Sequence, residues 1–209
     1  MSSREEILGR LRPLARNTPH PPPWQSQRQF PDLAARFTES LTAVLGEVIR
    51  ATDLDEAWQK LGDLLHQLEA ESIVANAEPP LTQLPITQLP NYLKWHILGQ
   101  TDTDWKTACE TADVGLTGAE AAFAETGSIV VSSGVNTSRM VSLLPPVHIA
   151  LVPESKLTAD IFTWTAARKG DLPANTVFVS GPSKTADIEM TLVKGVHGPK
   201  RFIVILYGD

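Results

Sequence analysis

The stretch Val147-His-Ile-Ala-Leu-Val152 decides the fold class, because it is almost continuously apolar and rich in β-branched side chains. Such a run predicts a β-strand that is covered on both faces. A chain that repeats this pattern favours a sheet of mostly parallel strands with a buried interior. Comparable short runs occur at residues 73–75, 114–116, 128–132, 176–179 and 202–206.

Several of these runs are separated by stretches with helical spacing. Leu157, Ile161 and Trp164 follow the cap candidate Ser155, and a second helical stretch follows Thr185. Alternating strands and helices predict an α/β fold, with a mostly parallel sheet and flanking helices. Open α/β sheets bind ligands beyond the carboxyl ends of their strands, so we expect a site in the segments that follow the strands.

Residues 1–70 differ in pattern from residues 71–209, and we interpret them as an N-terminal helical segment that packs on an α/β domain. Apolar residues recur every three or four positions from Phe30 to Val48, which predicts a long amphipathic helix. Asp53 is a typical cap for the next helix. The apolar faces of these helices would either pack on the sheet or dock a partner.

Composition excludes several classes of function. The chain has 209 residues, with 18 Lys and Arg against 24 Asp and Glu, and its net charge of −6 argues against general nucleic-acid binding. Cys109 is the single cysteine, so the chain cannot hold an iron–sulfur cluster alone, and no metal-ligand set stands out. Without a secretory signal or an apolar run of about 18 residues, we expect a cytoplasmic protein with no membrane span.

The segment that leads into the run at 128–132 is the first candidate for chemistry. It supplies a carboxylate, two hydroxyls and a glycine that permits close backbone approach to a ligand. The alternative is a helix or turn that ends at the glycine. The candidate residues are Glu125, Thr126, Gly127 and Ser128, with Glu125 as an acid–base group.

The segment behind the same run is small and polar and ends in a lone arginine. Arg139 would clamp a carboxylate or a phosphate with two parallel hydrogen bonds, and Gly134 belongs to the same candidate binding set. The alternative is a solvated loop with a surface arginine. His148 lies near the start of a predicted strand and is expected to be structural.

The third segment follows the run at 176–179 and precedes a predicted helix. Free backbone amides at a helix start attract anions, but the acidic residues in this turn would repel a phosphate. They would instead bind hydroxyls or a cation, or cap the helix. The Lys–Thr pair lacks the glycine spacing of a P-loop. The candidate binding residues are Ser180, Gly181, Ser183, Lys184, Thr185, Asp187 and Glu189.

His197, in the stretch Gly195-Val-His-Gly-Pro199, is the last candidate. A histidine at this point could act as an acid, a base or a ligand. The same pattern is also typical of a helix stop and turn.

Together these segments resemble the LUD domain family over roughly residues 70–209. Glu120 and Ser128 stand where an aspartate and a threonine are usual, and both keep the functional group. The order of the motifs and the size of the chain resemble the small C-type member of a three-protein lactate utilization system. The resemblance is carried by Ala112-Asp-Val-Gly-Leu-Thr-Gly-Ala-Glu-Ala-Ala-Phe-Ala-Glu-Thr-Gly-Ser128, Leu144-Pro-Pro-Val-His148, Ser180-Gly-Pro-Ser-Lys-Thr-Ala-Asp-Ile-Glu189 and Val193-Lys-Gly-Val-His-Gly-Pro199.

The resemblance implies a fold like that of the ribose-5-phosphate isomerase, glucosamine-phosphate deaminase and CoA-transferase group. It also implies a role in oxidising L-lactate to pyruvate with two partners, lactate utilization proteins A and B. Those partners are expected to carry the iron–sulfur clusters, so this chain would carry no cofactor of its own. Its part would be to bind a small carboxylate or other anionic metabolite in a cleft at the strand ends.

Two other functions fit the same residues. A stand-alone transferase or isomerase acting on a phosphorylated or CoA-linked metabolite would use Glu125 as its nucleophile or base. Kinship of fold is the only support for that reading, and fold does not fix function. A non-catalytic assembly module would use the amphipathic helices of residues 30–68 as its docking surface.

Overall fold

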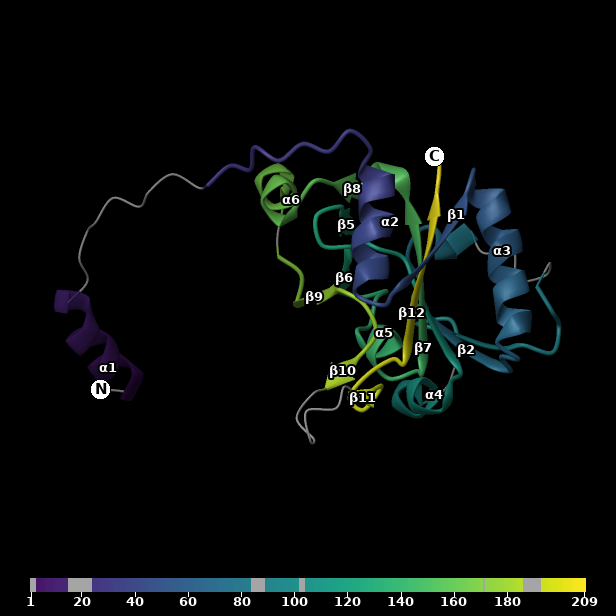
Figure 1. Cartoon of the computed structure of the whole chain (residues 1–209). Helices are drawn as coiled ribbons and strands as arrows, with labels where there is room; N and C mark the ends of the chain where they lie inside the picture. The colour runs from purple at the N-terminus through teal and green to yellow at the C-terminus, as the bar shows by residue number, and fades with distance from the viewer. Residues whose placement is uncertain (1–2, 15–23, 84–88, 102–103, 171, 186–192) are drawn as a thin grey trace.

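The computed structural model describes residues 3–14, 24–83, 89–101, 104–170, 172–185 and 193–209. Its centre is a six-stranded sheet in the order β1-β12-β7-β4-β2-β3, in which every neighbouring pair is parallel (Figure 1). The α/β fold with a mostly parallel sheet is therefore confirmed. The strands are β1 (Glu47–Ala51), β2 (Ser72–Ala75), β3 (Lys94–Ile97), β4 (Val114–Thr117), β7 (Val147–Pro153) and β12 (Arg201–Tyr207).

A second, smaller sheet packs against one face of the central sheet. It has the order β8-β5-β6-β9, and β6 is antiparallel to both of its neighbours. Ala122, Ile129 and Val131 of this sheet share one buried cluster with Ala150 and Val204 of the central sheet. Its strands are β5 (Ala121–Phe123), β6 (Ser128–Ser133), β8 (Leu157–Thr158) and β9 (Asn175–Val179), and a separate antiparallel pair is formed by β10 (Lys184–Thr185) and β11 (Val193–Lys194).

The helices cover both faces of the central sheet. The buried stripe of α3 packs on one face, while α2, α4 and α5 contact the other face, where the small sheet also lies. The helices are α1 (Ser3–Leu11), α2 (Leu33–Ala43), α3 (Leu54–Gln67), α4 (Trp105–Thr111), α5 (Met140–Leu143) and α6 (Ile161–Ala167), with 3-10 turns η1 (Arg12–Leu14), η2 (Leu81–Gln83) and η4 (Glu154–Lys156).

The helix α5 lies directly on β4 because β4 carries a glycine at the crossing. A Cβ atom at Gly115 would lie 1.8 Å from the carbonyl oxygen of Val141 in α5. Gly115 is paired with His148 of the neighbouring strand β7. The close approach therefore holds α5, with its buried Ser142, over the first residues of β7.

The amphipathic helices of the N-terminal segment pack on the sheet. Phe37 and Leu41 of α2 and Leu61 and Leu65 of α3 are fully buried, so these faces do not form an exposed docking surface. The helix predicted over residues 30–48 is too long, because α2 ends at Ala43 and Val48 belongs to β1. The division of the chain near residue 70 stays a prediction.

Two other helix predictions are corrected. The helix expected behind Ser155 begins only at Ile161, because the side chain of Asp160 accepts the capping hydrogen bond and Leu157 pairs in β8. Thr185 lies in β10 and Val193 in β11, so neither residue is helical. Residues 186–192 lie outside the described part of the chain.

The cap predicted at Asp53 is confirmed, since its carboxylate accepts a hydrogen bond from the backbone N–H of Glu56 at 2.8 Å. Replacing Asp53 with alanine leaves that helix-start donor unpaired, and we expect the free energy of unfolding to fall by about 1 kcal/mol. Urea unfolding followed by circular dichroism measures the change. Asp63→Ala, at an exposed position inside the same helix, is the matched control. Equal losses in both variants would contradict a capping role.

Candidate functional site

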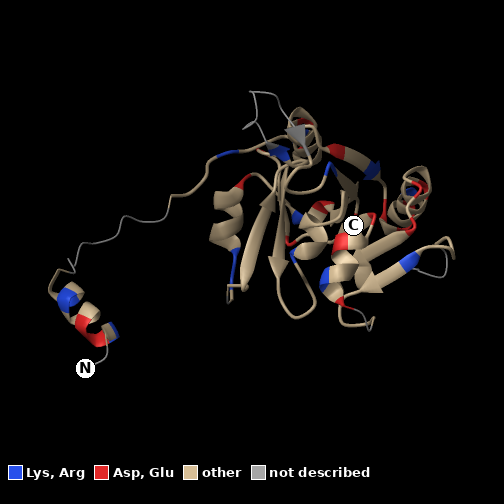
Figure 2. Ribbon diagram, turned by 90° about the horizontal axis from the view of Figure 1, so that it is seen from below, with Lys and Arg blue, Asp and Glu red and all other residues tan. Residues whose placement is uncertain are grey.

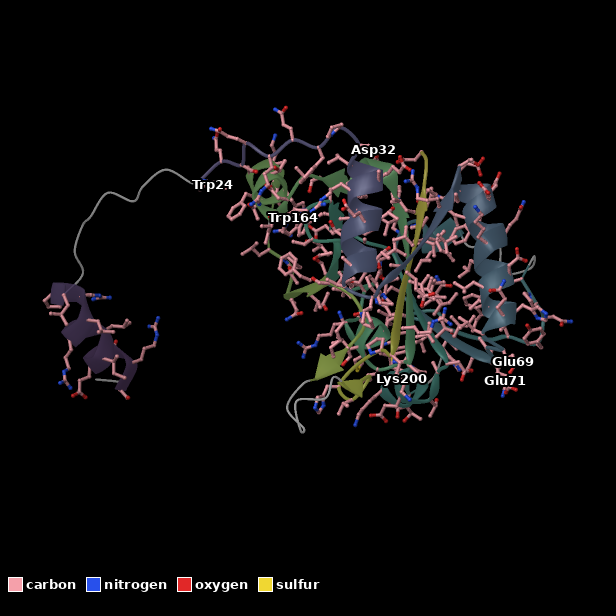
Figure 3. All side chains as sticks on the ribbon, viewed as in Figure 1. Trp24, Asp32, Glu69, Glu71, Trp164 and Lys200 are labelled. Carbon is pink, nitrogen blue, oxygen red and sulfur yellow. The ribbon has the colours of Figure 1, made fainter. Side chains whose placement is uncertain are left out.

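A cavity of about 180 Å³ gathers several of the polar residues that the sequence analysis singled out. It lies between the first residues of β7 and β12, the end of β9, α5 and the turn before β12. Lys200 follows Pro199, which lines the cavity. Figure 3 shows Lys200 at the lower end of the folded body, whereas Asp32, the cap of α2, lies at its upper end. The polar residues in its wall are Ser142, His148, Ser180, Ser183 and His197.

The position of the cavity differs from the expected one. It lies at the amino ends of β7 and β12, because His148 and Phe202 are the second residues of those strands. Ser180 follows the carboxyl end of β9, but β9 belongs to the small sheet, whose strands run in both directions. The rule that places ligands at carboxyl ends of a parallel sheet therefore did not locate this cavity.

His148 forms the floor of the cavity and is completely buried. Its Nε2 atom lies 2.8 Å from the hydroxyl of Thr117, and its ring stacks on Phe202 with 5.1 Å between ring centroids. Its Nδ1 atom is buried without a hydrogen-bond partner among the described residues. Burial disfavours the charged ring and lowers the pKa of His148 to about 3, so the ring is neutral at pH 7.

A chain of hydroxyl groups reaches the cavity from the turn before β6. The hydroxyls of Thr126 and Ser128 are 2.7 Å apart, and those of Ser128 and Ser180 are 2.6 Å apart. Hydroxyl groups both donate and accept, so protons in such a chain can all point the same way. The structure thus brings Thr126, Ser128 and Ser180 together from two segments that are distant in the sequence.

The turn before β6 depends on Gly127, whose backbone lies close to α2; close approach of a ligand to this glycine stays a prediction. Gly127 has a φ of 64°, and a Cβ atom there would lie 2.2 Å from the backbone nitrogen of Leu41. The buried hydroxyl of Ser40 donates to the carbonyl of Ala124 at 2.9 Å. These contacts fix the turn against α2.

Glu125 and Arg139 do not line the cavity. The carboxylate of Glu125 pairs with Arg28, from the extended segment that precedes α2. Arg139 is exposed at the start of α5, and Gly134 is exposed in the preceding loop, where its N–H donates to the carbonyl of Thr137 at 3.0 Å. The sequence predicts that Glu125, Arg139, Ser183 and His197 meet in one cleft at the rim of the sheet, and of these four only Ser183 and His197 share the cavity.

The loop that carries Arg139 is held by a polar network that the sequence analysis did not find. The side chain of Asn76, fully buried behind β2, accepts from the N–H of Ser138 at 2.9 Å and approaches Glu78 at 3.3 Å. Glu78 also accepts from the N–H of Gly118 at 3.0 Å. Burial raises the pKa of Glu78, with nearby Glu120 adding to the shift.

Glu120 continues this network toward the small sheet. Its carboxylate accepts from Nε of Arg168 at 2.9 Å and from the hydroxyl of Ser132. The network lies at β2 and β4, which are neighbours in the central sheet. The strand that follows β2 in the chain, β3, lies on one side of this pair, and the later strand β7 lies on the other side, so the order of the strands reverses here. The sequence signal for this network is an asparagine directly after a predicted strand, with a glutamate two residues later.

Gly181 lines the cavity, and Lys184 and Thr185 follow it in the same segment. The ammonium group of Lys184 donates to the carbonyl of Val44 at the end of α2, and Gly181, with a φ of 114°, lies against the same carbonyl. Thr185 lies in β10. Asp187 and Glu189 lie outside the described residues. His197 is exposed, so the rim is open to solvent while the floor is closed.

A model of the LUD domain matches residues 34–207 of the chain, which include α2, both sheets and every strand that lines the cavity. The chain belongs to the LUD domain family. The family prediction made from the sequence motifs is thereby confirmed, and the matched region begins well before residue 70.

The similarity to named relatives extends over nearly the whole of this LUD protein. It is 32% identical to a lactate utilization protein C of Halalkalibacterium halodurans over 90% of this chain and 88% of the relative. It is 34% identical to one from Exiguobacterium over 100% of this chain and 97% of the relative. Among solved structures, a DUF162 family protein from Deinococcus radiodurans has the same fold, with a TM-score of 0.60 and 19% identity, over 84% of this chain and 96% of that one.

Within the described ranges of this LUD chain, four features bear on cofactors and partners. Cys109 is buried in α4, and burial raises its pKa to about 11, so its thiol is protonated at pH 7. No three or more His, Cys, Asp or Glu side chains of the described residues gather to hold a metal ion. No described helix has the length and apolarity to cross a membrane. Figure 2 shows acidic and basic positions interspersed over the fold, without a single basic stripe.

Proposed function

We propose that this LUD protein is a non-redox subunit of an L-lactate utilization system and binds a small anionic metabolite in the cavity between β7, β9 and β12. The observation that carries the proposal is its similarity, over 90% or more of the chain, to proteins named lactate utilization protein C. Oxidation of L-lactate to pyruvate releases two electrons and two protons. Iron–sulfur clusters in the partner proteins would take up the electrons.

The cavity supports a binding role for this subunit. A volume of about 180 Å³ suits a metabolite of a few carbon atoms, and hydroxyl groups of Ser180 and Ser183 stand beside apolar walls from Val177 and Phe202. Pockets of this kind hold a ligand by shape and orient it with a few polar groups. Exposed His197 at the rim is the acid–base group nearest to the ligand in this proposal.

The partners in the proposal are lactate utilization proteins A and B. The single cysteine of this chain is buried and protonated, and a cluster needs several thiolates, so electron transfer is assigned to the partners. A complex in the cytoplasm fits this division of labour. Co-purification of A and B with a tagged form of this chain from lactate-grown cells tests the assembly.

Growth on L-lactate tests the role in lactate utilization. In a strain without another lactate dehydrogenase, we expect deletion of this gene to abolish growth on L-lactate while growth on pyruvate continues, because pyruvate enters metabolism after the proposed step. The wild-type gene should restore growth, and a gene with Ser180→Ala and Ser183→Ala should restore it poorly. Undiminished growth of the deletion strain on L-lactate would exclude the role.

A further inference from the structure

Helix α1 presents an apolar face to solvent (Figure 1). None of its residues is buried, and the side chains of Ile7 and Leu11 are 55% and 54% exposed. Leu14, in the turn η1 that follows the helix, is 72% exposed. Apolar residues spaced by three or four positions lie on one side of a helix, so these three side chains form one continuous surface, the α1 face. A contiguous exposed apolar surface is typical of an interaction site.

The length of α1 indicates that this face needs a partner. The helix has nine residues, and an isolated helix shorter than about 12–15 residues is marginally stable in water. Most helices of this size are stabilised by packing of their apolar side. The model of the LUD domain begins at residue 34, whereas the similarity to the protein from Exiguobacterium extends over 100% of this chain. That similarity therefore includes α1, which lies outside the matched LUD region.

The charged residues of α1 are divided between its two ends. Glu5 and Glu6 lie in the first turn, Arg10 lies in the last turn, and Arg12 follows in η1. Successive residues of a helix are rotated by about 100°, so Glu6 and Arg10 lie on one side of the α1 face. Glu5 and Arg12 lie on its other side. Each side of the α1 face is therefore acidic near the start of the helix and basic near its end.

This distribution of charge is complementary to itself in an antiparallel pair of α1 helices. A two-fold axis through the middle of the helix places Glu6 of each copy opposite Arg10 of the other copy. The same axis places Glu5 opposite Arg12. Opposite charges that flank an apolar helix face determine the orientation of paired helices. A parallel pair would place each of these side chains beside its own copy, and like charges disfavour that arrangement.

We propose that the α1 face is an interaction surface for a second copy of this chain, on which two α1 helices pack antiparallel and are oriented by Glu6–Arg10 pairs. The pairing does not depend on the ligand or the metabolic role given under the proposed function. Two nine-residue helices form a smaller interface than the roughly 1,200 Å² that stable complexes bury. We therefore expect a weak, reversible dimer with a Kd between about 10 µM and 1 mM.

Sedimentation equilibrium of the purified full chain, at concentrations from about 10 µM to 1 mM, tests the proposal. The wild-type chain should pass from monomer to dimer over this range. Leu11→Asp places a charge in the α1 face and should weaken self-association about tenfold or more. Gly9→Asp is the matched control, because it adds the same charge on the opposite side of the helix, where nothing lies within 4 Å of the new Cβ atom. It should leave self-association unchanged.

An exchange of charges distinguishes a second copy from any other partner. Glu6→Arg alone and Arg10→Glu alone each create two like-charged contacts in the dimer, so each should weaken self-association. An equimolar mixture of the two variants forms a heterodimer in which both contacts again join an arginine and a glutamate, so the mixture should associate more tightly than either variant alone.

Three results would overturn the proposal: a wild-type chain that is still a monomer at about 1 mM, a Leu11→Asp variant that dimerises like the wild type, or a mixture that associates no better than its components. A monomeric wild-type chain whose co-purification with lactate utilization proteins A and B is lost in Leu11→Asp would assign the α1 face to those partners instead.

Discussion

Replacing Gly127 with alanine is expected to lower the free energy of unfolding by about 3 kcal/mol, for two reasons that add. Gly127 has a φ of 64°, a backbone conformation that costs an alanine about 1 kcal/mol. The new Cβ atom would also lie 2.2 Å from the backbone nitrogen and 2.5 Å from the Cα of Leu41. Because these atoms belong to the backbone of α2, relief requires the helix or the turn to move.

Thermal unfolding measures the loss, and a decrease in Tm of roughly 6–12 °C corresponds to it in a chain of this size. Gly99→Ala is the matched control, since Gly99 also has a positive φ of 73° but nothing lies within 4 Å of the added Cβ atom. We expect Gly99→Ala to cost only the backbone term, about 1 kcal/mol. If Gly127→Ala costs no more than Gly99→Ala, the packing of the turn on α2 is wrong.

In the central sheet, the interior strands could be predicted from the sequence, while the two edge strands could not. The predicted runs at 147–152 and 202–206 lie within β7 and β12, which are covered on both faces and therefore consist of continuous apolar residues. β1 and β3 lie at the two edges of the sheet and are only partly buried. Val48 in β1 also fits the spacing of three or four residues between the apolar side chains of α2. This spacing alone therefore assigned Val48 to a helix instead of a strand.

The candidate site was predicted in part, because sequence patterns identify reactive residue types but not their long-range partners. Ser183 and His197 were expected to meet, and both line the cavity. Glu125 was expected there too, but Arg28 pairs with it from a segment far earlier in the chain. The position of His148 near the start of a predicted strand indicates a structural role. Its burial is what leaves Nδ1 unpartnered.

The same burial predicts how stability depends on pH. The pKa of His148 is about 3 in the folded chain against 6.5 for an ordinary histidine, so the unfolded chain binds one more proton between these values. Stability is therefore complete above about pH 6.5 and falls as the pH is lowered toward 3, by about 1.4 kcal/mol per unit in the middle of this window. Between pH 7 and pH 5 we expect a loss of about 2 kcal/mol from this residue.

Thermal unfolding at several pH values measures this dependence, and roughly 4–8 °C of Tm should be lost between pH 7 and pH 5 through His148. The contribution is isolated by comparison with His148→Gln, which cannot titrate and should flatten the curve. The comparison is needed because the raised pKa of Glu78 acts in the opposite sense, stabilising the folded chain as the pH falls toward 4.5. A wild-type curve as flat as that of His148→Gln would mean that His148 becomes protonated in the folded chain as readily as in the unfolded chain, and its neutral buried state would be wrong.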